Sequence, residues 1–127
     1  MNRAVTFLQE SETFYVATMD GDQPRVRPFG AAVEYNGKLY ICTSNRKKCF
    51  KQMVANPKVE IAAMKGPDWI RISGEVAVDP SPEAKKYFLQ ERPLPMYKPD
   101  DSIFEILYFT KATVTITSAT APESFEI

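Results

Sequence analysis

The sequence predicts a mainly β fold, in which a closed or nearly closed β-barrel carries a few helices. Short runs of β-branched and aromatic residues recur along the chain, and clusters of turn-forming residues separate them. The strongest turn is Asn36-Gly37, because both residue types tolerate the positive φ that a two-residue hairpin requires. A helical pattern follows the early strands, so we expect mostly antiparallel strands with a helix inserted among them.

Five strands are expected in the earlier part of the chain. Residues 13–19 are rich in aromatic and β-branched residues and stop at the turn Asp20-Gly21-Asp22. Residues 25–35 are predicted as one long strand that Pro28 and Gly30 interrupt, which is typical of an edge strand or a β-bulge. The other strands are expected at residues 38–43, 58–64 and 68–78, and the five together are expected to form a meander.

Three helices are expected around these strands. Residues 3–10 form a short amphipathic pattern, and residues 47–55 repeat apolar side chains at helical spacing until Asn56-Pro57 ends the helix. The third helix is expected over residues 81–90, because Ser81 is a good N-cap and Pro82 suits the first helical position.

The last part of the chain has weaker patterns. Residues 91–101 contain three prolines and little periodicity, so we expect a loop that covers a cleft or wraps a partner. Residues 103–109 and 112–117 alternate like two strands on either side of Thr110-Lys111. No structure is predicted for residues 119–127.

Length and composition limit the function classes. The 127 residues suit a single domain, and 16 basic residues balance 16 acidic ones, which argues against nucleic acid as a general partner. The chain has no histidine and two cysteines, so no metal site is expected, and haem held by histidine is excluded. No apolar stretch is long enough for a signal sequence or a membrane span, so we expect a cytoplasmic protein with reduced thiols and no membrane partner.

Two basic features suit a phosphate group. Arg25 and Arg27 lie two residues apart on a predicted strand, so their guanidinium groups project from one face. Thr43-Ser44-Asn45 precedes Arg46-Lys47-Lys48 at a strand-to-helix junction, where free backbone amides attract anions. Cations in a first helical turn oppose the helix dipole unless an anion compensates, which favours a ligand there. The ordinary alternatives, a solvated strand face and an exposed basic turn, stay open.

A third candidate is Trp69, which shares a strand face with Arg71. Its ring could wall a planar ligand, although a partly buried tryptophan at a strand start more often serves packing. Cys42 and Cys49 have no histidine to act as a base, so we interpret them as buried small residues rather than nucleophiles.

Several blocks of the sequence resemble the pyridoxamine 5′-phosphate oxidase-like family of FMN-binding split β-barrels. The first blocks are residues 20–28, DGDQPRVRP, and residues 37–43, GKLYICT. Further blocks follow in the same order at residues 47–53, 55–60 and 69–75, so the resemblance covers about residues 14–78. The resemblance implies a homodimer with FMN at the subunit interface.

The resemblance also implies which residues contact FMN. By position in these blocks, the expected contacts are Arg25, Lys47 and Lys48 at the phosphate; Val26, Arg27 and Pro28 along the ring and ribityl chain; Cys42, Thr43 and Ser44 through backbone and hydroxyl groups; and Trp69, which the partner chain could supply. The tryptophan and arginine pattern that pyridoxamine-phosphate oxidases carry near their C-terminus is not recognisable in residues 103–127, so oxidation of vitamin B6 is not expected.

The function implied by the resemblance is that of an FMN-dependent oxidoreductase. FMN would move hydride or electrons between a reduced donor such as NADH or NADPH and an unidentified acceptor, while Arg27 and backbone amides stabilise negative charge near the reduced ring. The alternative is a non-catalytic FMN-binding or electron-transfer protein. Split barrels also host haem and deazaflavin, and small barrels bind single-stranded nucleic acid, so these ligands stay open as further alternatives.

Overall fold

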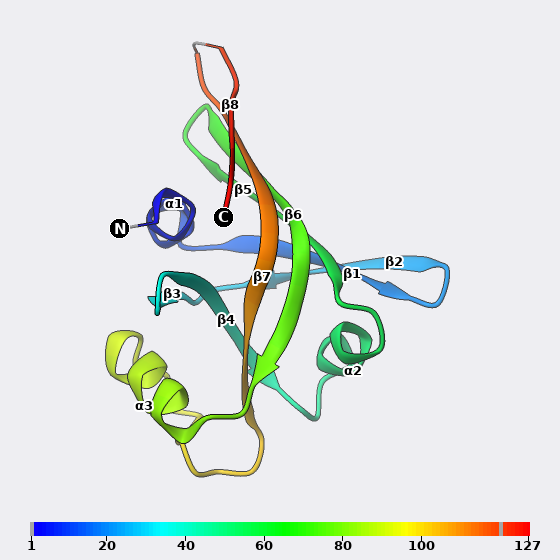
Figure 1. Cartoon of the computed structure of the whole chain (residues 1–127), viewed down its shortest axis with the longest axis vertical. Helices are drawn as coiled ribbons and strands as arrows, with labels where there is room; N and C mark the ends of the chain where they lie inside the picture. The colour runs from blue at the N-terminus through cyan, green and yellow to red at the C-terminus, as the bar shows by residue number, and fades with distance from the viewer. Residues whose placement is uncertain (1, 120) are drawn as a thin grey trace.

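The computed structural model describes residues 2–119 and 121–127 and shows one antiparallel sheet with helices packed around it (Figure 1). The helices are α1 (Arg3–Ser11), α2 (Lys48–Ala55) and α3 (Pro82–Glu91). The strands are β1 (Phe14–Asp20), β2 (Gln23–Phe29), β3 (Ala32–Tyr35), β4 (Lys38–Ser44), β5 (Lys58–Lys65), β6 (Asp68–Asp79), β7 (Phe104–Thr117) and β8 (Glu123–Glu126). The mainly β fold expected from the sequence is therefore confirmed.

The strands follow the order β2-β1-β5-β6-β7-β4-β3, and β8 pairs with β7 outside this path. Strand β7 pairs with a different strand on one of its sides in each half of its length. Its first half, from Phe104 to Tyr108, pairs with β4, whereas Thr113 to Ile116 pair with β8. The sheet thus splits at the middle of β7, and Figure 1 shows β6 and β7 running together past the crossing β1–β2 hairpin.

The predicted five-stranded meander is wrong. β1 and β2 form a hairpin at one end of the strand order, and β3 and β4 form another hairpin at the opposite end. The second hairpin turns at Asn36 and Gly37, whose φ values of 51° and 74° confirm the turn expected there. Hairpins depend on adjacent residues and could be predicted, whereas the order of the hairpins depends on packing between distant segments.

The predicted strand 25–35 is two strands, because the chain leaves the ladder at Gly30 and Ala31. β2 stands at the end of the strand order, so the edge position expected for this region is confirmed. Pro28 lies opposite Tyr15 of β1. A proline nitrogen has no hydrogen to donate, and an edge strand tolerates this because only one of its sides must pair.

The two strands predicted at residues 103–117 are one continuous strand. β6 runs past the expected turn, with Glu75 opposite Lys111 and Val76 opposite Phe109, so Thr110 is the extra residue of a β-bulge. The Thr110 hydroxyl donates to the Glu75 carbonyl oxygen at 3.2 Å, which satisfies this acceptor. The tail for which no structure was predicted adds β8 to the same strand.

Two hydrophobic clusters hold these elements together. The larger one lies within the curved sheet and under α1, and its centre includes Val16, Ile61 and Ile72, all fully buried. The smaller cluster packs α3 against β3, β4 and β7 through side chains such as Phe88 and Phe104. Within residues 2–119 and 121–127, no helix has the length and hydrophobicity needed to cross a membrane.

Gly74 lies opposite Ala112, next to the bulge, where β6 and β7 approach closely. A Cβ atom at Gly74 would lie 2.3 Å from the Lys111 carbonyl oxygen and 2.6 Å from the Ala112 Cβ. We therefore expect Gly74→Ala to lower the free energy of unfolding by about 1–3 kcal/mol in urea titrations followed by circular dichroism. Gly30→Ala is the matched control, because its Cβ would meet no described atom within 4 Å. Equal unfolding midpoints for the two variants would contradict the close approach.

Candidate functional site

A cavity of about 320 Å³ lies where the end of β2, the β4–α2 turn and the loop 91–101 meet. These segments are far apart in the sequence and form three walls. The lining residues are Arg27, Pro28, Phe29, Gly30 and Ala31 from the first segment, Cys42, Thr43, Lys47 and Cys49 from the second, and Arg92, Leu94, Met96 and Tyr97 from the third. The volume is within the range of small-molecule sites.

The cavity is positively charged. Arg27, Lys47 and Arg92 line it, and none of the described residues that line it is acidic. Burial raises the pKa of the Cys42 thiol to about 12, and the positive charges of Lys47 and Arg92 act in the opposite direction. Cations from two different walls therefore lie within electrostatic reach of this thiol, and the site suits an anionic ligand.

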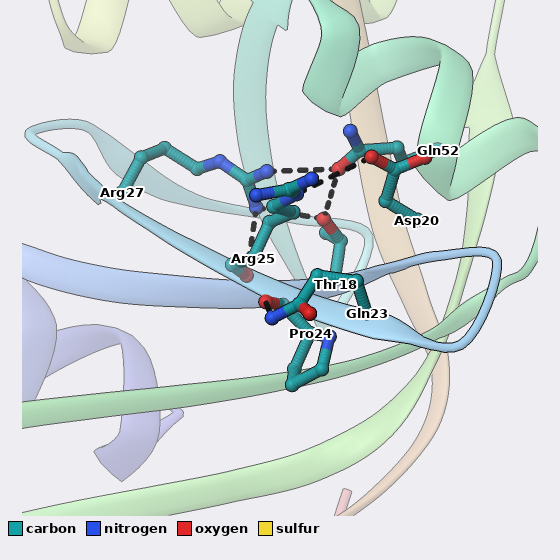
Figure 2. Close-up of polar contacts among 7 residues, drawn as sticks. All are labelled: Thr18, Asp20, Gln23, Pro24, Arg25, Arg27 and Gln52. Atoms are coloured by element: carbon teal, nitrogen blue, oxygen red, sulfur yellow. Dashed lines mark hydrogen bonds and ion pairs between the residues drawn. The ribbon is translucent and has the colours of Figure 1, made fainter.

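Arg27 is held in place by a hydrogen-bond network (Figure 2). Its Nη1 donates to the Val16 carbonyl oxygen at 3.0 Å and to Thr18 Oγ1 at 2.8 Å, and its Nη2 donates to Gln52 Oε1 at 2.9 Å. Thr18 Oγ1 in turn donates to Gln52 Oε1 at 2.6 Å. Because Gln52 belongs to α2, the network fixes Arg27 of β2 relative to β1 and to this helix.

Arg25 lies on the same strand in a different environment. Its Nε donates to Asp20 Oδ2 at 3.2 Å across the hairpin, and both side chains are about half exposed (Figure 2). An exposed ion pair of this kind contributes little to stability. Arg25 does not line the cavity, so any ligand group that it binds lies outside that cavity.

The N-terminus of α2 faces the cavity without a capping side chain. Lys47 is the N-cap residue, and within the described chain its helix has no side-chain cap hydrogen bond, unlike α1 and α3. The turn before it is held by Ser44 Oγ, which accepts from the Arg46 N–H at 3.2 Å, and by Asn45 Nδ2, which donates to the Ser102 carbonyl oxygen at 2.8 Å. Uncapped amides and cationic side chains at a helix start favour an anion.

The loop 91–101 forms the outer wall of the cavity, as expected of a segment that covers a cleft. Arg92 Nη2 donates to the Gly30 carbonyl oxygen at 3.1 Å, and the Tyr97 ring lies 4.9 Å from the Phe104 ring. Asp101 anchors the end of the loop. Desolvation raises the pKa of Asp101, but three backbone N–H donors outweigh it and hold this pKa below its ordinary value.

Part of the predicted site is brought together in one place. Arg27, Pro28, Cys42, Thr43 and Lys47 all line the cavity. Their proximity arises because β2 and the β4–α2 turn, each of which carries a pattern predicted to bind phosphate, approach one another beside α2. The two basic features of the sequence therefore meet through Arg27 and Lys47.

The other predicted residues lie outside this cavity. Val26 is 67% exposed on β2, Ser44 is buried at the end of β4, and Lys48 is exposed at the first residue of α2. Trp69 is the second residue of β6 and pairs with Met64 of β5. The Arg71 guanidinium lies 5.1 Å from the centre of its ring. Trp69 therefore does not reach the cavity of its own chain.

Eight of the thirteen described lining residues were not predicted as ligand contacts: Phe29, Gly30 and Ala31 after β2, Cys49 of α2, and Arg92, Leu94, Met96 and Tyr97 of the outer wall. Arg92, Leu94, Met96 and Tyr97 lie in a loop without periodicity, where the sequence carries no motif that marks a ligand contact. Cys49 was interpreted as a buried small residue; it is buried, and its Sγ lies 3.4 Å from Thr43 Oγ1 at the cavity. The prolines of the loop were the one available signal, and they indicated its location but not its contacts.

The family model for pyridoxamine 5′-phosphate oxidase matches residues 2–115 of the chain. The chain therefore belongs to the pyridoxamine 5′-phosphate oxidase family, and its fold is the FMN-binding split barrel that the sequence resemblance implied. Among solved structures, a NimC/NimA family protein from Clostridium acetobutylicum is 55% identical, with a TM-score of 0.95 over 98% of this chain and 91% of the other. At this identity the two chains belong to one family, so the present chain is also of the NimC/NimA type.

More distant structures share the fold alone. A pyridoxamine 5′-phosphate oxidase-related, FMN binding protein from Nostoc punctiforme is 14% identical, with a TM-score of 0.67 over 99% of this chain and 95% of the other. A heme binding protein from Mycobacterium smegmatis is 15% identical, with a TM-score of 0.71 over 93% of this chain and 57% of the other. No curated protein matches the sequence. The fold by itself therefore does not decide between these two cofactors.

The raised pKa of Cys42 makes its reactivity testable. The thiolate is the reactive form, and a pKa raised from 9.0 to about 12 lowers the thiolate fraction at pH 8 by roughly a thousandfold. We expect iodoacetamide to alkylate Cys42 of a Cys49→Ala variant correspondingly slowly at pH 8, and faster as the pH rises toward 11. Mass spectrometry measures the rate, with the guanidinium-unfolded chain as control. Equal rates for the folded and unfolded chains would show that the thiol is not buried as described.

Proposed function

We propose that the protein binds FMN in the cavity between β2, the β4–α2 turn and the loop 91–101, and that it works as an FMN-dependent oxidoreductase. The observation that carries the proposal is the convergence of Arg27, Lys47 and Arg92 on one cavity whose described lining contains no carboxylate. A cavity with this charge distribution attracts a dianionic phosphate ester, whereas a neutral or cationic ligand gains little electrostatic binding energy there.

The lining residues divide into a polar part and an apolar part. Lys47 and the uncapped amides of α2 suit the phosphate, since a helix N-terminus offers both donors and positive potential. Pro28, Leu94 and Tyr97 offer apolar surface to a planar ring. When bound, FMN supplies the hydride or electron transfer, and the protein supplies binding, orientation and charge.

The residue composition favours FMN over haem. The sequence contains no histidine, which is the commonest haem ligand. FMN binding requires no such ligand. It requires anion-binding donors and apolar surface beside the ring, and the cavity lining includes both.

A non-catalytic role as a flavin-binding or electron-transfer protein is the second candidate. It is favoured by the described lining, which contains no histidine and no carboxylate to act as a general acid or base, and in which the raised pKa keeps Cys42 protonated. Flavin chemistry with a reduced nicotinamide donor needs no such group, so the oxidoreductase stays the main proposal. Rapid anaerobic bleaching of bound FMN by NADH or NADPH supports the enzyme, whereas tight binding without bleaching supports the carrier.

We expect the wild-type protein to take up FMN with micromolar or tighter affinity and to quench its fluorescence. Lys47→Ala combined with Arg92→Ala should weaken FMN binding at least tenfold, because each substitution removes a cation from the cavity. Arg25→Ala combined with Lys48→Ala tests the phosphate contacts that the family resemblance implies, which lie outside the cavity. If the phosphate extends out of the cavity to these two residues, the double variant loses FMN binding with little change in the affinity for riboflavin, which lacks the phosphate; if the phosphate stays at Lys47 and the start of α2, the double variant keeps FMN binding. Fluorescence titration measures the affinity of the wild type and of each variant for FMN and for riboflavin.

The matched control for these variants is Lys51→Ala combined with Lys86→Ala, which removes two exposed lysines from α2 and α3 that do not line the cavity. This control should bind FMN like the wild type. If the wild type takes up no FMN, the proposed function is wrong. If the control weakens binding as much as the cavity variants do, the effect is one of net charge and not of the site.

We also propose that a second copy of the chain packs on the outer face of the sheet and completes the FMN site. This face contains a hollow of about 450 Å³ across β1, β5, β6, β7 and β8. Lys58 and Lys111 line it together with three glutamates, and such a mixture of signs can be self-complementary across a two-fold axis. Thr18 lines the hollow and also holds Arg27, so the hollow adjoins the cofactor cavity. Trp69 shares the outer face, which supports its contribution from a partner chain.

Ser73→Arg tests this interface, because Ser73 is exposed within the hollow and a long charged side chain there blocks close packing. We expect the wild type to be a dimer by light scattering and the variant to be a folded monomer with reduced FMN content. Lys86→Glu changes the charge of an exposed residue of α3 that does not line the hollow, and this control variant should stay dimeric. A wild-type monomer with full FMN content would contradict the interfacial placement of the cofactor.

A further inference from the structure

The network around Arg27 leaves one edge of its guanidinium group unused. A guanidinium has five N–H donors in a fixed plane. Both Nη1 hydrogens are engaged by the Val16 carbonyl oxygen and Thr18 Oγ1, with the Arg25 carbonyl oxygen more distant at 3.4 Å, and one Nη2 hydrogen is engaged by Gln52 Oε1. The Nε hydrogen and the second Nη2 hydrogen have no partner among the described residues. These two donors lie on the same edge of the plane and point in the same direction.

The other edge is occupied by a matched pair of acceptors. Thr18 Oγ1 and Gln52 Oε1 are 2.6 Å apart, and each accepts one hydrogen bond from the Nη1–Nη2 edge of Arg27 (Figure 2). The Thr18 side chain is 2% exposed, and its hydroxyl hydrogen is committed to Gln52, so its lone pairs face Arg27. Gln52 is held because the next residue of α2, Met53, is buried in the main core.

We propose that Thr18 and Gln52 are positioning residues that lock the Nη1–Nη2 edge of Arg27 and thereby present its Nε–Nη2 edge as a fixed pair of donors to two neighbouring acceptor atoms of FMN. The acceptors belong either to the phosphate or to the polar edge of the ring, and both share the chemistry of two adjacent electronegative atoms. This inference rests on the proposed function, since Arg27 lines the proposed FMN cavity.

Holding Arg27 in place before the ligand arrives lowers the conformational entropy that is lost on binding. An arginine side chain that is free in the empty protein loses rotamer freedom when it binds a ligand, and this loss weakens binding. Arg27 has already lost that freedom on folding. Arg25, two residues away, is held by one exposed ion pair through its Nε, which is the edge that Arg27 leaves available. The two arginines are therefore not equivalent, although they share a strand face.

A double-mutant cycle tests the inference. Thr18→Val removes the hydroxyl at constant shape, and Gln52→Met removes the amide at similar length and helix propensity. We expect each to weaken FMN binding roughly tenfold in the wild-type background and less than twofold in an Arg27→Ala background, because their effect acts through Arg27. Thr18→Ser, which keeps the hydroxyl, should restore binding to within about twofold, and Lys51→Gln on the exposed face of α2 should have no effect.

A comparison of FMN with riboflavin identifies the acceptor atoms. If Thr18→Val weakens FMN alone, the free edge of Arg27 binds the phosphate, and if it weakens both ligands equally, that edge binds the ring. Additive effects of Gln52→Met and Arg27→Ala on FMN affinity, with wild-type stability in urea, would overturn the inference.

A measurement without cofactor separates this inference from the proposed function. In the apo-protein labelled with ¹⁵N, a locked guanidinium rotates slowly, so we expect separate Nη signals for Arg27 that merge in Thr18→Val and Gln52→Met. Merged signals in the wild type overturn the lock whether or not FMN binds. Separate signals in a wild type that fails to bind FMN keep the lock and overturn the function.

Discussion

The pairing of β7 with β6 is the constraint on which the rest of the structure depends. These two strands stay paired from Trp69 opposite Thr117 to Asp79 opposite Ile106, and the bulge at Thr110 bends them without separating them. The bend lets one half of β7 accept β4 and the other half accept β8. Without it, a single strand could not serve two parts of the sheet that diverge.

The candidate site is a consequence of this arrangement. β4 reaches the first half of β7, and the chain then turns into α2, whose N-terminus is set beside the end of β2. α3 and the loop 91–101 must return to the start of β7 and therefore pass over the same region. Three segments that carry cations are thus gathered at one end of the barrel, and the core holds them there through Met53 and Phe104.

Local chemistry explains which parts of the fold could be predicted. The Asn36-Gly37 turn, the Ser81 cap and the β4–α2 junction each depend on a few adjacent residues, and all three were identified from the sequence. The strand order was missed because β1 pairs with β5 and β4 with β7, and no local pattern encodes these pairings. The continuity of β7 was missed for the same reason, since its bulge is set by the residues of β6 opposite to it.

The same distinction applies to the site. Arg27 and Lys47 belong to short patterns with a physical reason to bind an anion, so they could be found without a structure. Arg92 could not, because it reaches the cavity through the fold of a loop rather than through a motif. The role of Gln52 was equally hidden, since its contact with Arg27 joins a helix to a strand that is distant in sequence.

The fastening of the loop 91–101 has a consequence for how the cavity lining can be changed. Its two ends are fastened, by the bond from Arg92 to Gly30 and by the turn around Asp101, while Met96 between them is 65% exposed and supports no other element. Leu94 and Tyr97 pack against the smaller hydrophobic cluster, so Met96 is the position between the anchors that can be exchanged without disturbing this packing. The outer wall therefore offers one exposed position, Met96, at which a change of side chain alters the cavity lining at low cost in stability.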